Sequence, residues 1–296
     1  MKWRNQPQSD NIEDVRGGGG MGRALPIGGG IGTLVLAFVI YLMGGDPSAV
    51  LQQGQGGSGP NTSVSRPDNS RSGQTPRQGG AAQNDDEKRF VSAILADAED
   101  IWGKFFAQRG QTYRKPKLVL FSDRVQSACG IAGASAGPFY CPGDQKLYID
   151  LAFFRELQSR LGAPGDFAQA YVIAHEVGHH VQNQMGTMRK VNALQDRASK
   201  SESNQLSVRL ELQADFYAGV WAHYAKRKGL LEAGDVEEAL NAASTVGDDR
   251  LQQEGRGYVV PDSFTHGSSQ QRAEWFQRGL SSGDLKQGNT FGPGFE

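Results

Sequence analysis

Apolar residues are unevenly spread along the 296 residues, and their spacing divides the chain into five segments. They are sparse before residue 26, form an uncharged run from Ile27 to Met43, and almost disappear again up to residue 86. Beyond that point they recur at helical or alternating spacing, which is typical of a folded domain. The predicted segments are a disordered segment 1–25, an apolar segment 26–45, a disordered linker 46–86, a folded domain 87–285 and a tail 286–296.

The folded domain has the pattern of an α+β protein that is mostly helical and carries a small sheet. Short apolar runs at 117–121 and 145–151 predict strands, with a Gly/Ala-rich loop between Cys129 and Cys141. A polar stretch, 186–204, predicts a surface loop. Apolar residues at helical spacing predict helices at about 87–108, 153–160, 166 onward, 204–228, 235–246 and 268–278.

The apolar segment 26–45 predicts one transmembrane helix. Its uncharged run of seventeen residues is at the short end for a spanning helix, and nothing before residue 86 would bury it as a core helix. Four Lys or Arg residues precede the run and none follows it before Arg66, so the positive-inside rule places the N-terminus in the cytoplasm and the domain outside. A cleaved signal peptide is the alternative. An external domain would permit a disulfide between Cys129 and Cys141.

The charge balance argues against nucleic acid as a partner. The formal net charge is −1, and the chain has neither a basic surplus nor an acidic tail. The two cysteines are twelve residues apart, which is not the close spacing of a zinc ribbon.

A His-Glu-x-x-His motif, His175, Glu176 and His179, is the most specific chemical signal in the chain. Residues four apart are neighbours on one helical face, so His175 and His179 can bind one Zn²⁺. Glu176 is rotated by roughly 100° and can act as the general base beside the metal. Asp166, as N-cap, and Gln169 are typical of the start of the helix that carries the motif.

A catalytic zinc site usually has three protein ligands, so a third must come from elsewhere. The metzincin pattern fails, because Gln182 and Met185 stand where it needs Gly and His. Glu211 and Asp215 share one face of a largely apolar helix and need a partner there. We expect Glu211 to bind zinc and Asp215 to accept a hydrogen bond from a ligand histidine, His175 in the first instance.

The remaining candidates leave alternatives open. Glu211 and Asp215 would otherwise form surface pairs with Arg209 or Lys226, and His223 is the substitute third ligand. His180 points away from His179 and is expected to pack or hydrogen-bond. His266, in a loop before a helix, is a candidate for stabilising the oxyanion of a tetrahedral intermediate, or else a local cap or surface histidine.

His-Glu-x-x-His followed by Glu-x-x-Ala-Asp resembles the gluzincin arrangement of zinc endopeptidases, and more closely one bacterial family of neutral zinc metallopeptidases. The stretches that carry this resemblance are 3–14, 137–142, 175–182, 211–219, 247–250 and 265–272. The resemblance implies a zincin-like fold and a single-pass membrane protein with an external metallopeptidase-like domain. It implies His175, His179 and Glu211 as ligands, Glu176 as base, and His266 with Arg272 near the site.

The sequence therefore predicts a membrane-anchored zinc endopeptidase with protein or peptide substrates. The strand that includes Lys146 is a candidate for pairing with an extended substrate. A catalytically silent, membrane-tethered module that keeps zinc for binding or assembly is the alternative. The intact Glu176 argues against it, because a structural zinc site needs no base.

Overall fold

The computed structural model describes residues 1–16, 78–133, 136–293 and 295. The predicted transmembrane segment 26–45 and residues 46–77 of the predicted linker lie outside the described residues. Within the described residues, no helix is both long and apolar enough to cross a bilayer.

A four-stranded sheet has the order β1, β2, β6, β5. β1 (Ile12–Asp14), β2 (Lys117–Phe121) and β6 (Lys146–Asp150) run parallel, and β5 (Phe139–Cys141) pairs antiparallel with β6. The two predicted strands are thus confirmed as the central pair. β6 has a neighbour on each side, so the expectation that it pairs with a substrate is wrong, and β5 is the edge strand on that side.

The segment predicted as a Gly/Ala-rich loop is more ordered than expected. β3 (Arg124–Ser127) and β4 (Gly130–Gly133) form an antiparallel hairpin, and β5 follows it. Their main-chain partners lie across the sheet or hairpin, so periodicity within a run of Gly and Ala could not reveal them.

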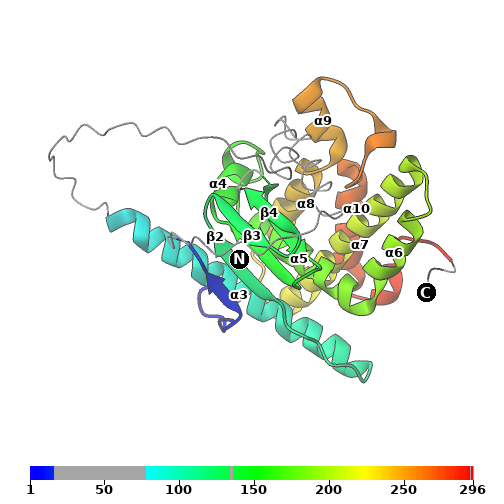
Figure 1. Cartoon of the computed structure of the whole chain (residues 1–296). Coiled ribbons are helices and arrows are strands. Elements are labelled where there is room, and N and C mark those ends of the chain that lie inside the picture. Colours follow the sequence, from blue (N-terminus) through cyan, green and yellow to red (C-terminus); the bar gives the residue numbers. More distant parts are fainter. Residues whose placement is uncertain (17–77, 134–135, 294, 296) are drawn as a thin grey trace, which may run out of the picture.

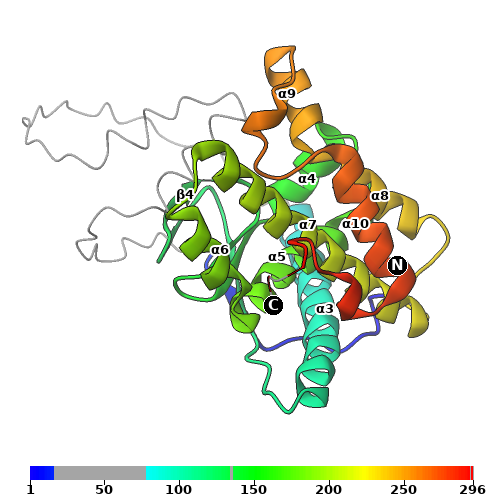
Figure 2. The ribbon, with the colours of Figure 1, turned by 90° about the vertical axis from the view of Figure 1, so that its right-hand side faces the viewer.

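Helices make up most of the described chain, as predicted. α5 lies at the centre of the domain. The sheet and α3 lie against it, and α7 and α8 pack on its other sides (Figures 1 and 2). Their bounds are α3 Gln78–Gln108, α4 Ala152–Ser159, α5 Asp166–Met185, α6 Thr187–Gln195, α7 Lys200–Arg227, α8 Asp235–Thr245, α9 Asp248–Arg256 and α10 Ser269–Ser282, with short 3₁₀ helices at Pro261–Ser263 and Leu285–Gln287.

Two glycines let α7 and α10 cross closely. A Cβ added to Gly219 would lie 2.1 Å from the carbonyl oxygen of Phe276, and one added to Gly279 would lie 2.1 Å from that of Phe216. Larger residues would force the two backbones apart. The core that these helices enclose is rich in aromatic residues, among them Trp102, Tyr171, Phe167, Phe216 and Trp221, all less than 2% exposed.

The N-terminal segment was expected to have little structure, and for residues 1–16 this is wrong. Met1 and Trp3 are buried in the main core, and β1 adds a parallel strand to β2. The segment has few apolar residues, but Met1, Trp3 and Ile12 pack against partners that lie far away in sequence. Residues 1–16 therefore belong to the folded domain.

Four smaller expectations also need correction. α3 begins at Gln78, inside the predicted linker, because an existing helix extends at little cost. The predicted loop 186–204 contains α6 and the first turn of α7, which starts from a capping box of Ser199 and Glu202. Asp166 is the first residue of α5 and not its side-chain cap. The tail 286–296 contains buried Phe291, whose carbonyl oxygen accepts a hydrogen bond from Arg209.

Candidate metal centre

α5 presents the motif from the middle of a buried helix. Nearly every residue of α5 from Phe167 to Gln182 is buried, and the helix ends at Gly186 in a left-handed conformation, with φ 81°. Helical spacing brings the rings of His175 and His179 together, with their centroids 4.8 Å apart. Both histidines and Glu176 are less than 10% exposed.

α7 brings the predicted third ligand to these histidines. It approaches α5 closely at Gly178, where an added Cβ would lie 3.0 Å from the carbonyl oxygen of Ala214. Glu211 then faces both rings: its Oε2 is 3.1 Å from Nε2 of His175, and its Oε1 is 3.3 Å from Nε2 of His179.

The donor set fits a zinc ion. One ligand atom from each of His175, His179 and Glu211 lies within 4.8 Å of the others. Two atoms bonded tetrahedrally to one zinc at about 2.0–2.1 Å stand about 3.4 Å apart, close to the two nitrogen–oxygen distances here. Two imidazoles with one carboxylate form a known catalytic zinc set.

Each histidine is oriented through its other nitrogen. Nδ1 of His175 lies 2.8 Å from Oδ1 of Asp215, and Nδ1 of His179 lies 2.9 Å from Oε1 of Gln182. Both oxygens are acceptors here, so both Nδ1 atoms carry the proton and both Nε2 atoms are left to bind a metal. The predicted role of Asp215 as a hydrogen-bond partner of His175 agrees with this geometry.

Asp215 is also the centre of a buried ionic cluster. It is fully buried and binds the Arg272 guanidinium at two points, 2.8 Å and 3.0 Å, and its Oδ1 accepts from the hydroxyl of Tyr171. Burial opposes ionisation, but Arg272 and His175 outweigh it and keep the pKa of Asp215 below its ordinary value. The alternative in which Asp215 forms a surface pair is therefore excluded.

The protonation states of the buried side chains in the site depend on one another. Burial favours neutral His175, but the carboxylates of Asp215 and Glu211 outweigh it and raise the pKa of His175 to about 10. Burial also opposes ionisation of Glu211, yet His179 and His175 hold its pKa well below the usual range. For Glu176 burial dominates and raises the pKa, which suits a group that accepts a proton and releases it again.

His266 is held at the edge of this cluster by Asp248. Oδ1 of Asp248 is 3.2 Å from Nδ1 of His266, and Oδ2 accepts backbone N–H groups from Thr265, His266 and Gly267 at 2.6–3.1 Å. Burial opposes a charge on His266, but the bond to Asp248 and the field of Glu211 raise its pKa. Its side chain remains 30% exposed, so a substrate can reach the ring.

The other two histidines lie outside this group. His180 contacts the Tyr140 hydroxyl and the carbonyl oxygen of Arg114, and burial lowers its pKa to about 4, so it is a packing residue as expected. Nδ1 of His223 contacts the carbonyl oxygen of Leu280 on α10. His223 is therefore part of a helix contact and not the third ligand.

Cys129 and Cys141 form a disulfide that ties the β3–β4 hairpin to β5, with their Cα atoms 5.8 Å apart. This pairing agrees with the sequence expectation.

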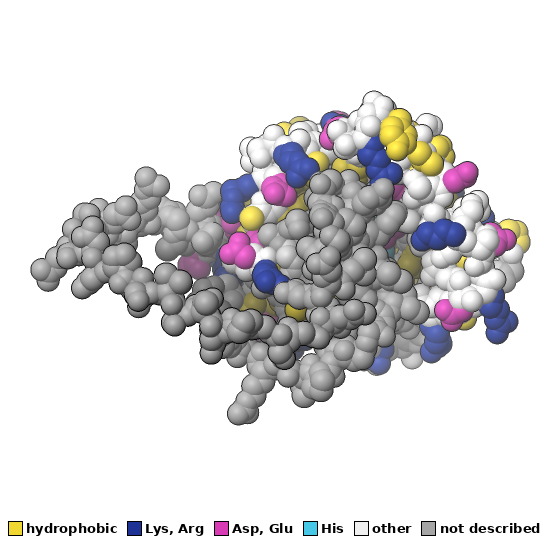
Figure 3. All heavy atoms as spheres, turned by 45° about the horizontal axis from the view of Figure 1, so that its top comes forward, with side chains coloured by type: hydrophobic (Ala, Val, Ile, Leu, Met, Phe, Trp, Pro, Cys, Tyr) yellow, Lys and Arg dark blue, Asp and Glu magenta, His cyan; other side chains and the backbone are white. Residues whose placement is uncertain are grey.

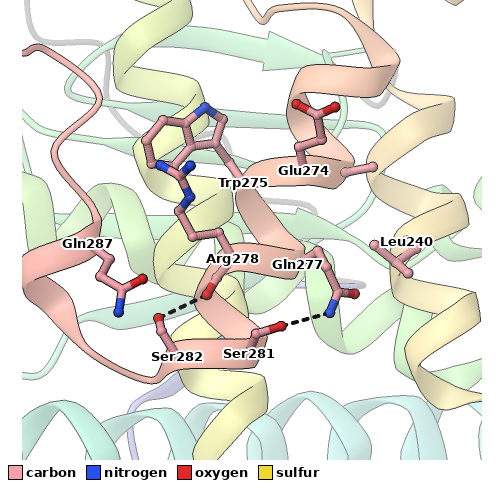
Figure 4. A pocket seen from close by; sticks show the side chains of 9 residues that line it. Leu240, Glu274, Trp275, Gln277, Arg278, Ser281, Ser282 and Gln287 are labelled. Carbon is pink, nitrogen blue, oxygen red and sulfur yellow. Dashed lines mark hydrogen bonds between the residues drawn. The ribbon is translucent and has the colours of Figure 1, made fainter.

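A shallow groove of about 810 Å³ lies elsewhere, between α8, α10 and the last 3₁₀ helix (Figure 4). Arg278 stacks on Trp275 there, 4.5 Å from the ring centroid. None of the residues that line the groove belongs to the histidine cluster, so the groove is a separate feature. On the face drawn in Figure 3, basic and acidic side chains are interspersed.

Known proteins resemble this chain over most of its length. Residues 1–291 match the model of a family described as "Putative neutral zinc metallopeptidase". The chain belongs to this family. Its relatives include the uncharacterized protein YpfJ of Escherichia coli K12, 50% identical over 300 residues and 99% of each chain. An uncharacterized protein of Mycobacterium tuberculosis H37Rv is 43% identical over 190 residues, 60% of this chain and 63% of its own length. No solved structure matches the chain.

Three residues of this site were missed in the sequence. Gln182 and Tyr171 lie three and four residues from a ligand histidine on the motif helix, so helical spacing alone could have placed them beside it. Asp248 gave a weaker signal: it lies in one of the family-like stretches, but its contact with His266 spans eighteen residues.

Proposed function

We propose that this protein is a zinc-dependent endopeptidase. The observation that carries the proposal is the orientation of the two histidines. Asp215 and Gln182 hold their Nδ1 atoms, and both Nε2 atoms face the Glu211 carboxylate. Glu176 lies next in sequence to the first ligand, on the same buried helix. A purely structural site would have no use for this additional carboxylate.

Bound zinc would polarise the scissile carbonyl and make a nearby water more acidic. Glu176 accepts a proton from the attacking water and delivers it to the departing amine, and its raised pKa favours this transfer in both directions. Protonated His266 donates a hydrogen bond to the oxygen that gains negative charge. Asp248 favours this protonated form and holds Nδ1, which leaves Nε2 to donate.

The edge strand β5 is the proposed docking strand for substrate. The Tyr140 hydroxyl accepts from Asn183 and lies 3.2 Å from Nδ1 of His180, so β5 runs beside the C-terminal half of α5, next to the motif. An extended peptide paired with β5 would present backbone carbonyls along the histidine helix.

We further propose that the domain acts outside the cytoplasm and is held at a membrane surface by the apolar segment 26–45. The uncharged run in that segment supports attachment to a membrane, and the disulfide between Cys129 and Cys141 supports an oxidising compartment.

The test is Glu176→Gln in the full chain purified in detergent, with zinc measured by mass spectrometry and cleavage measured on a peptide library. Full-length protein is required, because a fragment from residue 86 would lack β1. We expect retained zinc and lost cleavage, while Glu237→Gln, an exposed glutamate of α8, should retain both. A zinc-loaded wild type that cleaves nothing would contradict the proposal and favour the silent binding or assembly module.

A further inference from the structure

Residues 1–16 dock on α3 through side chains and backbone. Trp3 is 7% exposed and packs edge-on against Phe90, with ring centroids 5.4 Å apart. Ser9 and Ser92 bind each other twice: Ser9 donates its N–H to the Ser92 carbonyl oxygen at 3.2 Å, and the Ser92 hydroxyl donates to the Ser9 carbonyl oxygen at 3.0 Å. These contacts join positions more than eighty residues apart.

A buried carboxylate on α3 depends on the same segment. Glu99 is 4% exposed, and its Oε1 accepts from the Ser9 hydroxyl and the Asn11 amide, each at 2.8 Å. Lys115 pairs with its other oxygen at 3.0 Å. Without residues 1–16, Glu99 would keep one ion pair and lose both hydrogen bonds at Oε1, which is costly for a buried carboxylate.

β1 continues the docking into the sheet. Ile12, Glu13 and Asp14 lie in register with 118–120 of β2. Leu118 donates its N–H to the Asn11 carbonyl oxygen at 2.8 Å, and the Glu13 carboxylate bridges Lys117 at 3.0 Å and Lys146 at 2.8 Å. The segment thus contacts both a core helix and the two central strands.

We propose that residues 1–16 are a permanent part of the catalytic domain, so that segment and domain lie on the same side of the membrane. Paired strands are about 4.8 Å apart, whereas the hydrocarbon core of a bilayer is about 30 Å thick. A single crossing between residues 16 and 78 would separate β1 from β2. The expectation of a cytoplasmic N-terminus with an external domain is therefore replaced by a shared compartment. The family match, which begins at residue 1, is consistent with an integral role for the segment.

Sidedness is tested with two single-cysteine reporters in the full chain, Asn5→Cys in the segment and Lys226→Cys on α7, both exposed. Each is placed in a Cys129→Ala, Cys141→Ala background. Spheroplasts are treated with a membrane-impermeant maleimide before and after permeabilisation. We expect both reporters to react alike, either both before or both only after permeabilisation. Reaction of one reporter in intact spheroplasts, with the other protected until permeabilisation, would overturn the proposal.

Docking is tested separately on the purified full chain with native cysteines. Trp3→Ala should lower the thermal unfolding midpoint by roughly 10 °C or prevent folding, while exposed Asn5→Ala should leave it unchanged. Equal midpoints for both variants would show that the segment is not part of the domain. Neither test uses peptidase activity, so each result is independent of the proposed catalytic function.

Discussion

Two clusters of metal-ligating side chains lie along α5, and their differences identify the better metal site. One joins His175, His179 and Glu211 in the middle of the helix, and the other joins Asp166, Asp235 and Glu238 at its beginning. Both bring ligand atoms within 4.8 Å of one another. Proximity of ligand atoms therefore does not distinguish them.

The two clusters differ in the partners that already surround their ligand atoms. The acidic cluster already has cationic and N–H partners: the Met1 amino group lies 2.7 Å from Asp166 and 3.4 Å from Asp235, and Glu238 accepts the backbone N–H of Phe167 at 3.0 Å. The histidine cluster has two imidazole rings, and a hydrogen bond at Nδ1 of each ring fixes its orientation. Such oriented imidazoles are typical of zinc sites, and an internally paired acidic cluster is not.

Among the substitutions that test this difference between the two clusters, removal of a zinc ligand should have the largest effect. Glu211→Gln takes away the only anionic ligand, and we expect the purified protein to lose stoichiometric zinc and all cleavage. Glu238→Gln, the matched change in the acidic cluster, should keep both. Mass spectrometry measures the zinc content of the two variants. Equal loss of zinc from both would contradict the assignment of the metal to the histidine cluster.

Asp215→Asn should have the next largest effect. It leaves the buried Arg272 with only the more distant Glu211 carboxylate, at 3.9 Å, as a counter-charge, which costs about 3–5 kcal/mol in unfolding free energy. Zinc affinity should fall by about 10–100-fold, because His175 loses its orienting carboxylate. Asp166→Asn, at a site whose side chain is 36% exposed, should cost less than about 1 kcal/mol. Denaturant unfolding and competitive zinc titration measure these differences; similar losses for the two variants would contradict the contrast.

Gln182→Met should weaken zinc binding with a smaller cost in stability. The change keeps the side-chain volume but removes the acceptor for Nδ1 of His179, so affinity should drop by about 10-fold or more. Gln184→Met is the control, because Gln184 contacts His180 and the carbonyl oxygen of Arg114 and no ligand histidine. Competitive titration with a zinc chelator compares them, and unchanged affinity in Gln182→Met would exclude an orienting role.

Asp248→Asn should give the smallest effect on zinc and a distinct effect on pH dependence. Burial opposes a charge on His266, while Asp248 and Glu211 raise its pKa, so the protonated form persists to higher pH. Activity that needs protonated His266 is lost as pH rises through this raised pKa. Removing the Asp248 charge should therefore move the alkaline limb of kcat/KM to lower pH. An unmoved limb would remove His266 from the proposed mechanism.

The sequence predicted the parts of the site that depend on local spacing. His175 and His179 are one helical turn apart, and so are Glu211 and Asp215 on α7, so each pair could be assigned to one face of one helix. The contact between the two helices was inferred because buried acids need partners. The two central strands could also be predicted from local sequence, because their apolar runs are short and continuous.

What the sequence did not reveal depends on distant contacts. Trp3 and Ile12 are isolated apolar residues in a polar segment, and their burial requires α3 and β2, which follow about a hundred residues later. The hairpin and β5 lie in Gly-rich sequence and owe their structure to pairing across strands. Asp248 is recognisable only once the loop that carries His266 folds back over it.

A crystal structure of the zinc-loaded full chain, with anomalous data collected at the zinc edge, would locate the metal. We expect one strong peak bonded to Nε2 of His175, Nε2 of His179 and the Glu211 carboxylate, and no peak among Asp166, Asp235 and Glu238. A zinc peak in the acidic cluster, or one bonded to His180 or His223 in place of Glu211, would contradict it.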